Sequence, residues 1–282
     1  MSVEFERFRG RQSVLDVTIA TIESIPRPAR IGVSIIALPV VWWLLIQAEV
    51  LGFGVFVTPT ETAGALVSYL TGTPMADGVT IYHHAAYSAG RVVIGTTLAV
   101  SIAIPLGLVI GTRRRWDRWV FPALEFLRPI PPIAWVPLVL VLFPTTRSGV
   151  IFVVCLGAFF PTLINTIRGV ESIEIEYQRA AASLGASDRK ILQHVVLPSA
   201  LPAIITGVSI GVGIGWITVV GAEMITAEYG LGHVVFQAYR LIDMQSVVVG
   251  MIAAGALGGL STGGVAVLGR RIAPWQQAGG AE

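Results

Sequence analysis

Charged side chains that could do chemistry are few in this sequence, and they lie near or within apolar segments. They are Glu49, Arg91, Glu125, Arg128 and Glu223. An ionisable group inside a membrane is costly and is therefore a functional candidate by default. Glu125 and Arg128 are three residues apart, which favours a structural pair on one helical face. For Glu223, a boundary contact and a role in a solute pathway both remain open.

Nucleophiles and metal ligands form no recognisable constellation in the sequence. Ser88 and Ser101 have no companion histidine and acid at a triad-like spacing. His83 and His84 are adjacent rather than four apart, which favours a surface pair over a metal site. Cys155 lies in an apolar run and is expected to pack there. With no phosphate-binding G-x-x-x-x-G-K-[ST] loop, the sequence predicts no enzymatic activity, metal or cofactor in this chain.

The composition is that of an integral membrane protein. Of 282 residues, 54% are hydrophobic and 13% are charged, and the mean hydropathy is +0.76. A soluble domain carries about twice that share of charged residues. A single cysteine excludes an internal disulfide framework, and a net charge of +2 without a basic stripe argues against nucleic acid binding.

Six apolar runs are long enough to cross a bilayer, since a helical crossing needs roughly 20 residues. Continuous apolar runs lack the alternation of barrel strands, so the predicted fold is all-α with about six transmembrane helices. The first run is too far from Met1 for a cleaved signal peptide and is expected to stay as an anchor. The runs are about 31–52, 88–111, 120–143, 149–167, 199–222 and 246–268.

Basic residues predict the orientation, because they accumulate in short cytoplasmic loops. Most of the 19 basic residues precede the first run, or lie between runs two and three or four and five, or follow the sixth. Both termini and loop 168–197 are therefore expected in the cytoplasm. The predicted organisation is a cytoplasmic segment 1–30, a first helix 31–52, an external segment 53–87 with a short helix starting at Pro59, a core 88–275 and a cytoplasmic tail 276–282.

Loop 168–197 is the most informative stretch. A helix is expected from Glu174 to Leu184, with Gly185 in the left-handed conformation that ends many helices. Ser187 can then cap a second helix, which Leu197 and Pro198 would end. On this pattern alone, an ordinary hairpin on the membrane surface remains an alternative.

The spacing within this loop resembles the EAA loop of ABC importer permeases, whose pattern is E-A-A, three residues, G, nine residues, I-x-L-P. Ala180, Ala181, Gly185, Leu197 and Pro198 match it at full spacing. Arg179 stands in place of the glutamate and Val195 in place of the isoleucine. The resemblance implies that these residues, with Leu184 as a hydrophobic anchor, contact an ATPase.

Three further segments, 126–143, 157–170 and 219–238, look like the taurine, aliphatic sulfonate and nitrate branch of these permeases. The resemblance covers about residues 85–275 and implies the type I importer architecture, with a small, anionic solute as cargo. It also implies two permease copies in lipid, a cytoplasmic ATPase dimer that binds ATP and Mg²⁺, and an external binding protein. The branch includes other solutes, so the substrate itself stays open.

The spans offer polar side chains but hardly any charge. A weakly polar passage between the third, fourth and fifth spans is expected, with affinity residing in the binding protein; the alternative is that Arg91 or Arg128 forms a true anion site. Prolines are expected to bend the third span. Candidate pathway residues are Pro131, Pro132, Thr162, Asn165, Ser209 and Thr218.

Gly207, Gly211 and Gly215 recur every four residues on the fifth span, a pattern that lets helix backbones approach closely. Packing within the chain and contact between subunits both remain open for them.

Two other functions compete with the permease. A transporter driven by an ion gradient commonly needs mid-membrane titratable or broken-helix ion sites, for which few candidates exist, and an intramembrane enzyme needs a catalytic cluster.

Overall fold

The structure is a computed structural model that describes residues 26–48, 57–75, 77–226 and 228–274, and every element in these ranges is helical. The remaining residues, including most of predicted segment 1–30, Glu49 and the tail 276–282, lie outside the described part. The chain divides into two compact units, Met1–Gly64 and Ala65–Glu282, which are described separately.

The first unit contains α2 (Arg27–Gln47) and the start of α3 (Pro59–Leu70). The predicted helix start at Pro59 is found, and the cause is a capping box. The backbone N–H of Thr58 donates to Glu61 Oε2 at 2.8 Å, and the Glu61 N–H donates to Thr58 Oγ1 at 3.3 Å. The Thr58 backbone N–H and hydroxyl, which both donate to the carboxylate, lower the pKa of exposed Glu61.

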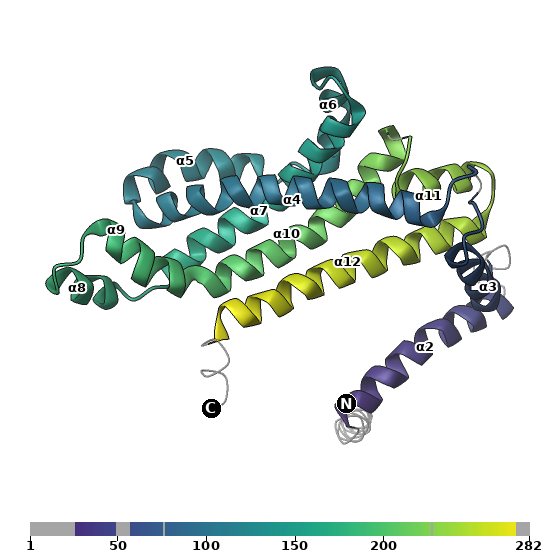
Figure 1. The fold of residues 1–282 in the computed structure, drawn as a ribbon, viewed down its shortest axis with the longest axis horizontal. Helices are drawn as coiled ribbons and strands as arrows, with labels where there is room; N and C mark the ends of the chain where they lie inside the picture. Colours follow the sequence, from purple (N-terminus) through teal and green to yellow (C-terminus); the bar gives the residue numbers. More distant parts are fainter. Residues whose placement is uncertain (1–25, 49–56, 76, 227, 275–282) are drawn as a thin grey trace, which may run out of the picture. The chain divides into compact units, whose positions relative to one another are not determined.

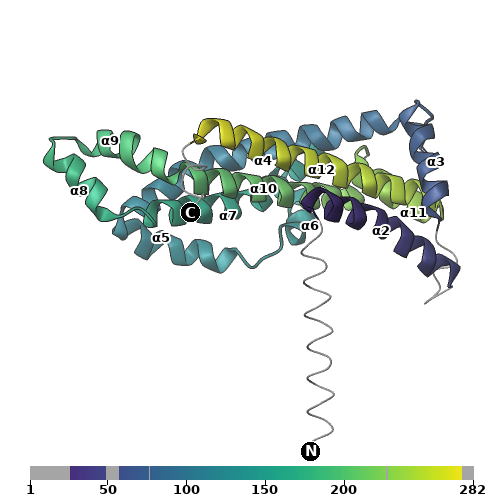
Figure 2. The ribbon, with the colours of Figure 1, turned by 90° about the horizontal axis from the view of Figure 1, so that it is seen from below.

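The second unit is organised around four long helices, α4 (Ile81–Thr112), α7 (Thr146–Glu171), α10 (Leu197–Thr226) and α12 (Met244–Ile272). They run side by side along one axis (Figures 1 and 2), with α7 between α4 and α10 and with α12 against α10. Each is long and apolar enough to cross a membrane. These four helices correspond to predicted spans two, four, five and six, and α4 starts seven residues before the predicted boundary.

Glycine and small side chains allow α4 and α7 to pack closely. A methyl group added to Gly95 would lie 2.7 Å from Val154 Cγ1, and one added to Gly107 would lie 2.7 Å from the Thr166 side chain. At the start of α7, the Thr145 side chain accepts a hydrogen bond from the Ser148 N–H. The resulting core lies between α4, α7 and α10 and is rich in valine.

The predicted third span, 120–143, is not one straight helix. It consists of α5 (Arg114–Leu127), the 3₁₀ turn η2 (Pro132–Trp135) and α6 (Val136–Leu142), and its two halves meet at 81°. Pro131 and Pro132 lie at this break. A proline lacks the N–H that a continuous helix requires. The predicted bend is therefore confirmed, and at 81° it separates the span into two helices.

The described residues thus provide up to five membrane-crossing segments, when the bent pair is counted as one segment. The first predicted span, 31–52, falls on α2, whose described apolar part, Ile36–Gln47, is shorter than a crossing. Short helices lie at opposite ends of the long helices (Figure 1): α8 (Ile175–Ser183) with α9 (Asp188–Ile191) at one end, and α11 (Leu231–Arg240) at the other.

Candidate functional site

Loop 168–197 folds into a helical projection beyond the end of the long helices (Figure 2). It begins in the last turn of α7, continues through α8 and α9, and then enters a π-helical segment, η3 (Leu192–Val196), that leads into α10. The predicted helix from Glu174 to Leu184 is confirmed, since α8 has Glu174 as its N-cap and Leu184 as its C-cap.

Gly185 ends α8 in a left-handed conformation, with φ +83°. Its N–H donates to the carbonyl of Ala182 at 2.9 Å, and the N–H of Ala186 donates to that of Ala181 at 3.1 Å. These two bonds form a Schellman motif, which satisfies carbonyls at the end of a helix. A methyl group added to Gly185 would meet nothing within 4 Å, so backbone conformation rather than space demands glycine here.

An apolar face of α8 projects into open space. Tyr177, Ala180 and Leu184 lie on it because they follow the helical spacing of three and four residues. All three are exposed, and Leu184 is 89% accessible. The neighbouring Arg179 is also exposed, and Ala181 is half-buried. An exposed leucine on a rigid helix, surrounded by small side chains, is suited to a partner surface.

The expectation that Leu197 and Pro198 end the second helix is wrong. From Asp188 to Thr226 the chain is one continuous helical run. The N–H of Leu197 bonds five residues back to the carbonyl of Leu192, so the π-turn inserts an extra residue just before Pro198. Proline lacks a backbone N–H and its ring crowds the preceding turn, and the π-turn accommodates it, so the helix continues. Ser187 occupies the N-cap position of α9, but its side chain makes no capping bond.

The loop is anchored to the long helices at its base. Val196 is buried with Val170, Ala200 and Ile204, while Val195 beside it is half-buried. The loop and the end of α4 also border a groove of about 1460 Å³. Of the motif residues after the turn, Val195 and Pro198 are half-buried and Leu197 is exposed, so the core contact of this part comes from Val196 between them.

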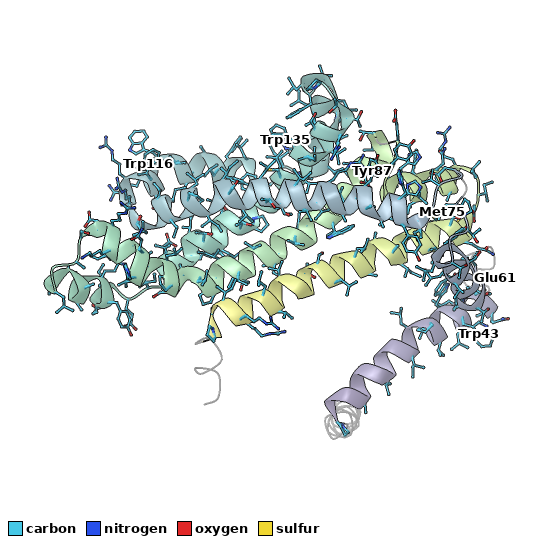
Figure 3. The ribbon with its side chains drawn as sticks, viewed as in Figure 1. Trp43, Glu61, Met75, Tyr87, Trp116 and Trp135 are labelled. Carbon is cyan, nitrogen blue, oxygen red and sulfur yellow. The ribbon has the colours of Figure 1, made fainter. Side chains whose placement is uncertain are left out.

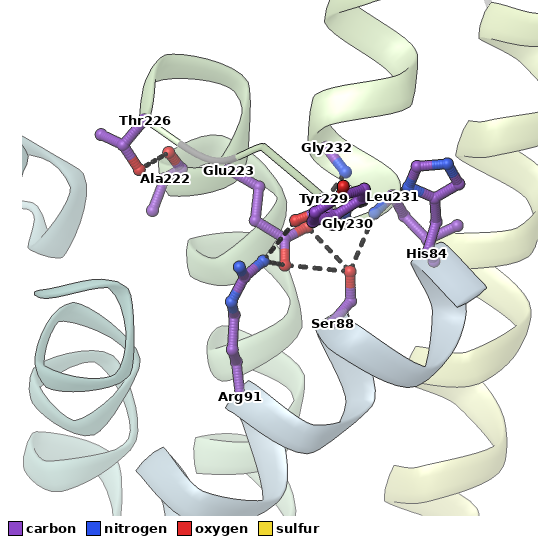
Figure 4. A network of polar contacts seen from close by, with 10 residues as sticks. All are labelled: His84, Ser88, Arg91, Ala222, Glu223, Thr226, Tyr229, Gly230, Leu231 and Gly232. Atoms are coloured by element: carbon purple, nitrogen blue, oxygen red, sulfur yellow. Dashed lines mark hydrogen bonds and ion pairs between the residues drawn. The ribbon is translucent and has the colours of Figure 1, made fainter. Parts of the chain in front are cut away.

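A second cluster, which we call the polar network, lies at the opposite end of the long helices (Figure 4). It is made of Ser88 and Arg91 on α4, Glu223 on α10 and the turn 229–232. Arg91 Nη1 lies 2.6 Å from Glu223 Oε1, and Ser88 Oγ donates to Glu223 Oε2 at 2.8 Å. Glu223 is fully buried and Arg91 nearly so. A buried carboxylate needs such partners, because an unpaired buried charge is very costly.

The network also holds the backbone of the turn between α10 and α11. The Gly232 N–H donates to Glu223 Oε2 at 3.1 Å, and Arg91 Nη1 donates to the carbonyl of Tyr229 at 2.6 Å. Gly230 has φ +135°, and a methyl group added there would collide with the Glu223 carboxylate. The turn therefore requires glycine for both its conformation and its close approach.

His84 extends the network towards the loop before α4. Its Nδ1 accepts from the Gly230 N–H at 3.2 Å, and its Nε2 lies 3.0 Å from Asp77 Oδ2. With Nδ1 accepting, a neutral imidazole carries its proton on Nε2, which is buried close to the Asp77 carboxylate but makes no hydrogen bond to it. His233 of α11 stacks against His84, with ring centroids 6.3 Å apart.

One interpretation from the sequence is therefore wrong. His84 is fully buried rather than a surface residue, although His83 beside it is exposed. Ser88 bonds to Glu223 and to the Leu231 N–H, which come from α10 and the following turn, far away in the sequence. One signal was present: Arg91 and Glu223 are opposite charges in two apolar spans. The predicted pair of Glu125 and Arg128 is confirmed at 2.9 Å.

The candidate pathway residues are mostly engaged within or between helices. Thr162 is fully buried and donates to the carbonyl of Ala158 at 2.8 Å, and Asn165 donates to that of Pro161 at 2.8 Å. Thr218 is buried where Gly157 approaches it. Ser209 borders a groove of about 600 Å³ between α10 and α12. The structure thus brings no polar ring together from these residues within the described chain.

The three glycines of the fifth span face helices of the same chain. Gly207 and Gly211 lie against α7, where added methyl groups would come within 2.7 Å of Asn165 Cβ and 2.9 Å of the Ala158 carbonyl. Gly215 faces Thr96 of α4 at 3.2 Å. Close packing within the chain therefore explains this row.

Comparison with known proteins agrees with this architecture. Residues 103–274 match the family described as binding-protein-dependent transport system inner membrane component. The chain is 33% identical over 235 residues to the taurine transport system permease protein TauC of Escherichia coli, covering 83% of this chain and 85% of TauC. The chain belongs to this family and is a membrane permease subunit rather than an enzyme.

Other relatives cover less of the chain. A putative ABC transporter permease protein of Methanocaldococcus jannaschii is 45% identical over 172 residues, which are 61% of this chain and 64% of that protein. The bicarbonate transport system permease protein CmpB of Synechocystis is 35% identical over 190 residues, 67% of this chain and 68% of CmpB. A chain of the inward-facing MetNI methionine ABC transporter shares the fold, with a TM-score of 0.60 at 18% identity over 67% of this chain and 94% of that one.

Proposed function

We propose that the chain forms the membrane pathway of an ATP-driven importer for a small anionic solute, working as a pair of copies. An ATPase dimer would dock on loop 168–197, and an external binding protein would deliver the solute at the opposite end. ATP and Mg²⁺ would be bound by the ATPase rather than by this chain.

The observation that carries this proposal is the exposed apolar face of α8, together with the way α8 is connected to the long helix α10. The Gly185 turn fixes α8 against α9, and α9 continues without a break into α10. A displacement of Leu184 by a partner would therefore be transmitted along a helix that reaches the polar network at its far end, through Glu223. Family membership favours this reading over an ion-gradient-driven transporter.

The orientation follows from the arrangement of basic residues. Arg113 and Arg189 border one groove, and Arg270 lies in the last turn of α12 next to the groove at the start of α10. All three therefore lie at the end that carries α8. Because cytoplasmic ends are enriched in lysine and arginine, we place loop 168–197 and both termini in the cytoplasm.

The nature of the solute is inferred from relatives, and the low affinity of the passage from the pairing of two arginines in the described part of the chain. Taurine and bicarbonate, named for two relatives, both carry an anionic group. Arg91 is neutralised by Glu223 and Arg128 by Glu125, so neither is free to hold an anion tightly. Affinity would then belong to the binding protein, and the passage would be weakly polar.

The test is reconstitution of the chain in proteoliposomes with its ATPase and binding protein. We expect ATP hydrolysis and uptake to be stimulated by one small anion, such as taurine, another sulfonate, nitrate or bicarbonate, only when the binding protein is present. Glycerol serves as an uncharged control. Uptake that persists without the ATPase and follows an imposed ion gradient would contradict the proposal.

A further inference from the structure

The start of α5 carries a basic and aromatic cluster that the transport cycle does not use. Four arginines, Arg113, Arg114, Arg115 and Arg118, fall within six residues, with Asp117 as the acidic residue among them. The described ion pairs do not involve Arg113, Arg115 or Arg118. This end of α5 therefore presents a concentrated positive charge without internal compensation in the described part of the chain.

Two tryptophans lie beside these arginines and form the wall of a groove. The groove, of about 910 Å³, is lined by Arg113, Arg115, Trp116, Trp119 and Val120. Trp119 is 79% exposed, and Trp116 projects away from the ribbon (Figure 3). Tryptophan favours the boundary between headgroups and hydrocarbon, because its ring is apolar and its N–H is polar.

The outer face of α5 continues this wall as an apolar stripe. Trp116, Trp119, Ala123 and Phe126 follow one another at three- and four-residue spacing, so they share one face. All four are exposed, while the opposite face of α5 packs through Val120, Phe121 and Leu124 on the core between α4 and α7. A charged group at the start and an apolar track along the helix match the two parts of a phospholipid.

We propose that the start of α5 is a binding site for an anionic phospholipid. The guanidinium groups of Arg113 and Arg115 take the headgroup phosphate, and an acyl chain lies along the stripe from Trp116 to Phe126. Basic groups beside a membrane attract anionic lipids, and arginine matches the geometry of a phosphate group. The site lies at the same end as loop 168–197, since Arg113 also borders the groove of that loop.

The experiment measures lipid retained by the purified full-length chain. Detergent-solubilised protein is equilibrated with equal amounts of phosphatidylglycerol and phosphatidylcholine, and the bound lipid is counted by native mass spectrometry. The test variant is Arg113→Gln with Arg115→Gln. The matched control is Arg270→Gln with Arg271→Gln, which removes two arginines from the same end at the exposed last turn of α12.

We expect the test variant to retain about 25-fold less phosphatidylglycerol than the wild-type chain, because each arginine near the bilayer surface contributes about fivefold. The control variant should retain as much as the wild-type chain. Trp119→Ala should weaken retention without changing the preference for the anionic headgroup. Equal losses in both double variants would show a general charge effect and overturn the proposal. Competition by millimolar inorganic phosphate would assign the site to free anions instead, and would equally overturn it. If the double variant fails to fold, Arg115→Gln alone provides the same comparison.

Discussion

Arg91 on α4 and Glu223 on α10 form a buried ion pair, with 2.6 Å between Nη1 and Oε1. The pair ties two long helices together at the end opposite loop 168–197, and it also holds the turn between α10 and α11. A charge pair in this position neutralises the basic group that could otherwise bind an anionic solute.

Removing one member of this pair should destabilise the protein more than removing both. Glu223→Gln leaves the Arg91 charge buried without a counter-charge, which costs about 3–5 kcal/mol in comparable buried pairs. Arg91→Met combined with Glu223→Met removes both charges and should recover much of that loss. The measurement is thermal unfolding in detergent, and a double variant less stable than Glu223→Gln would contradict a pairing role.

The turn at Gly230 should be intolerant of any side chain. Gly230→Ala meets both the unfavourable φ of +135° and the Glu223 carboxylate, so we expect a loss of more than about 2 kcal/mol. Gly72 is a matched control, because it has φ +101° and nothing within 4 Å of an added methyl group. Gly72→Ala should cost about 1 kcal/mol from conformation alone. Equal losses in the two variants would mean that the contact with Glu223 adds nothing.

The sequence could predict the parts of the fold that depend on local pattern. Apolar run length located four long helices, the alanine-rich segment located α8, and the spacing of Gly185 from the alanines located its turn. Each of these features is encoded within about 30 consecutive residues. Charge spacing on one helix likewise predicted the pair of Glu125 and Arg128.

The polar network could not be predicted in this way, because Ser88 and Arg91 lie more than 130 residues from Glu223 in the sequence. Ser88 and His84 acquire their partners only when the turn 229–232 folds onto α4. The continuation of α9 into α10 was also missed. Pro198 normally signals the end of a helix, and nothing local indicated that a π-turn would accommodate it.

The exposed face of α8 should matter for assembly and not for folding. Leu184→Asp replaces a side chain that is 89% exposed, so the unfolding temperature of the isolated chain should change little. Co-purification with the ATPase should be lost, because an aspartate would have to be desolvated at the contact. Ala181→Arg should have a similar effect through steric exclusion. An ATPase that still co-purifies with Leu184→Asp would rule out this face as the docking surface.

Orientation can be tested by accessibility of introduced cysteines. With Cys155 replaced by alanine, Asp188→Cys should react with a membrane-impermeant maleimide only after cells are opened. Gln245→Cys, exposed at the opposite end next to the start of α12, should react in intact cells. The reverse pattern would invert the proposed topology.

The central claim is that loop 168–197 couples this chain to an ATPase, and the Gly185 turn tests it most directly. Gly185→Val places a β-branched residue at φ +83°, whereas asparagine tolerates that conformation, and a Cβ added at this position meets nothing within 4 Å. In the reconstituted complex, we measure solute transported per ATP hydrolysed. We expect Gly185→Val to lose binding-protein-stimulated transport and Gly185→Asn to keep most of it. Wild-type coupling in Gly185→Val, at unchanged expression, would contradict the account.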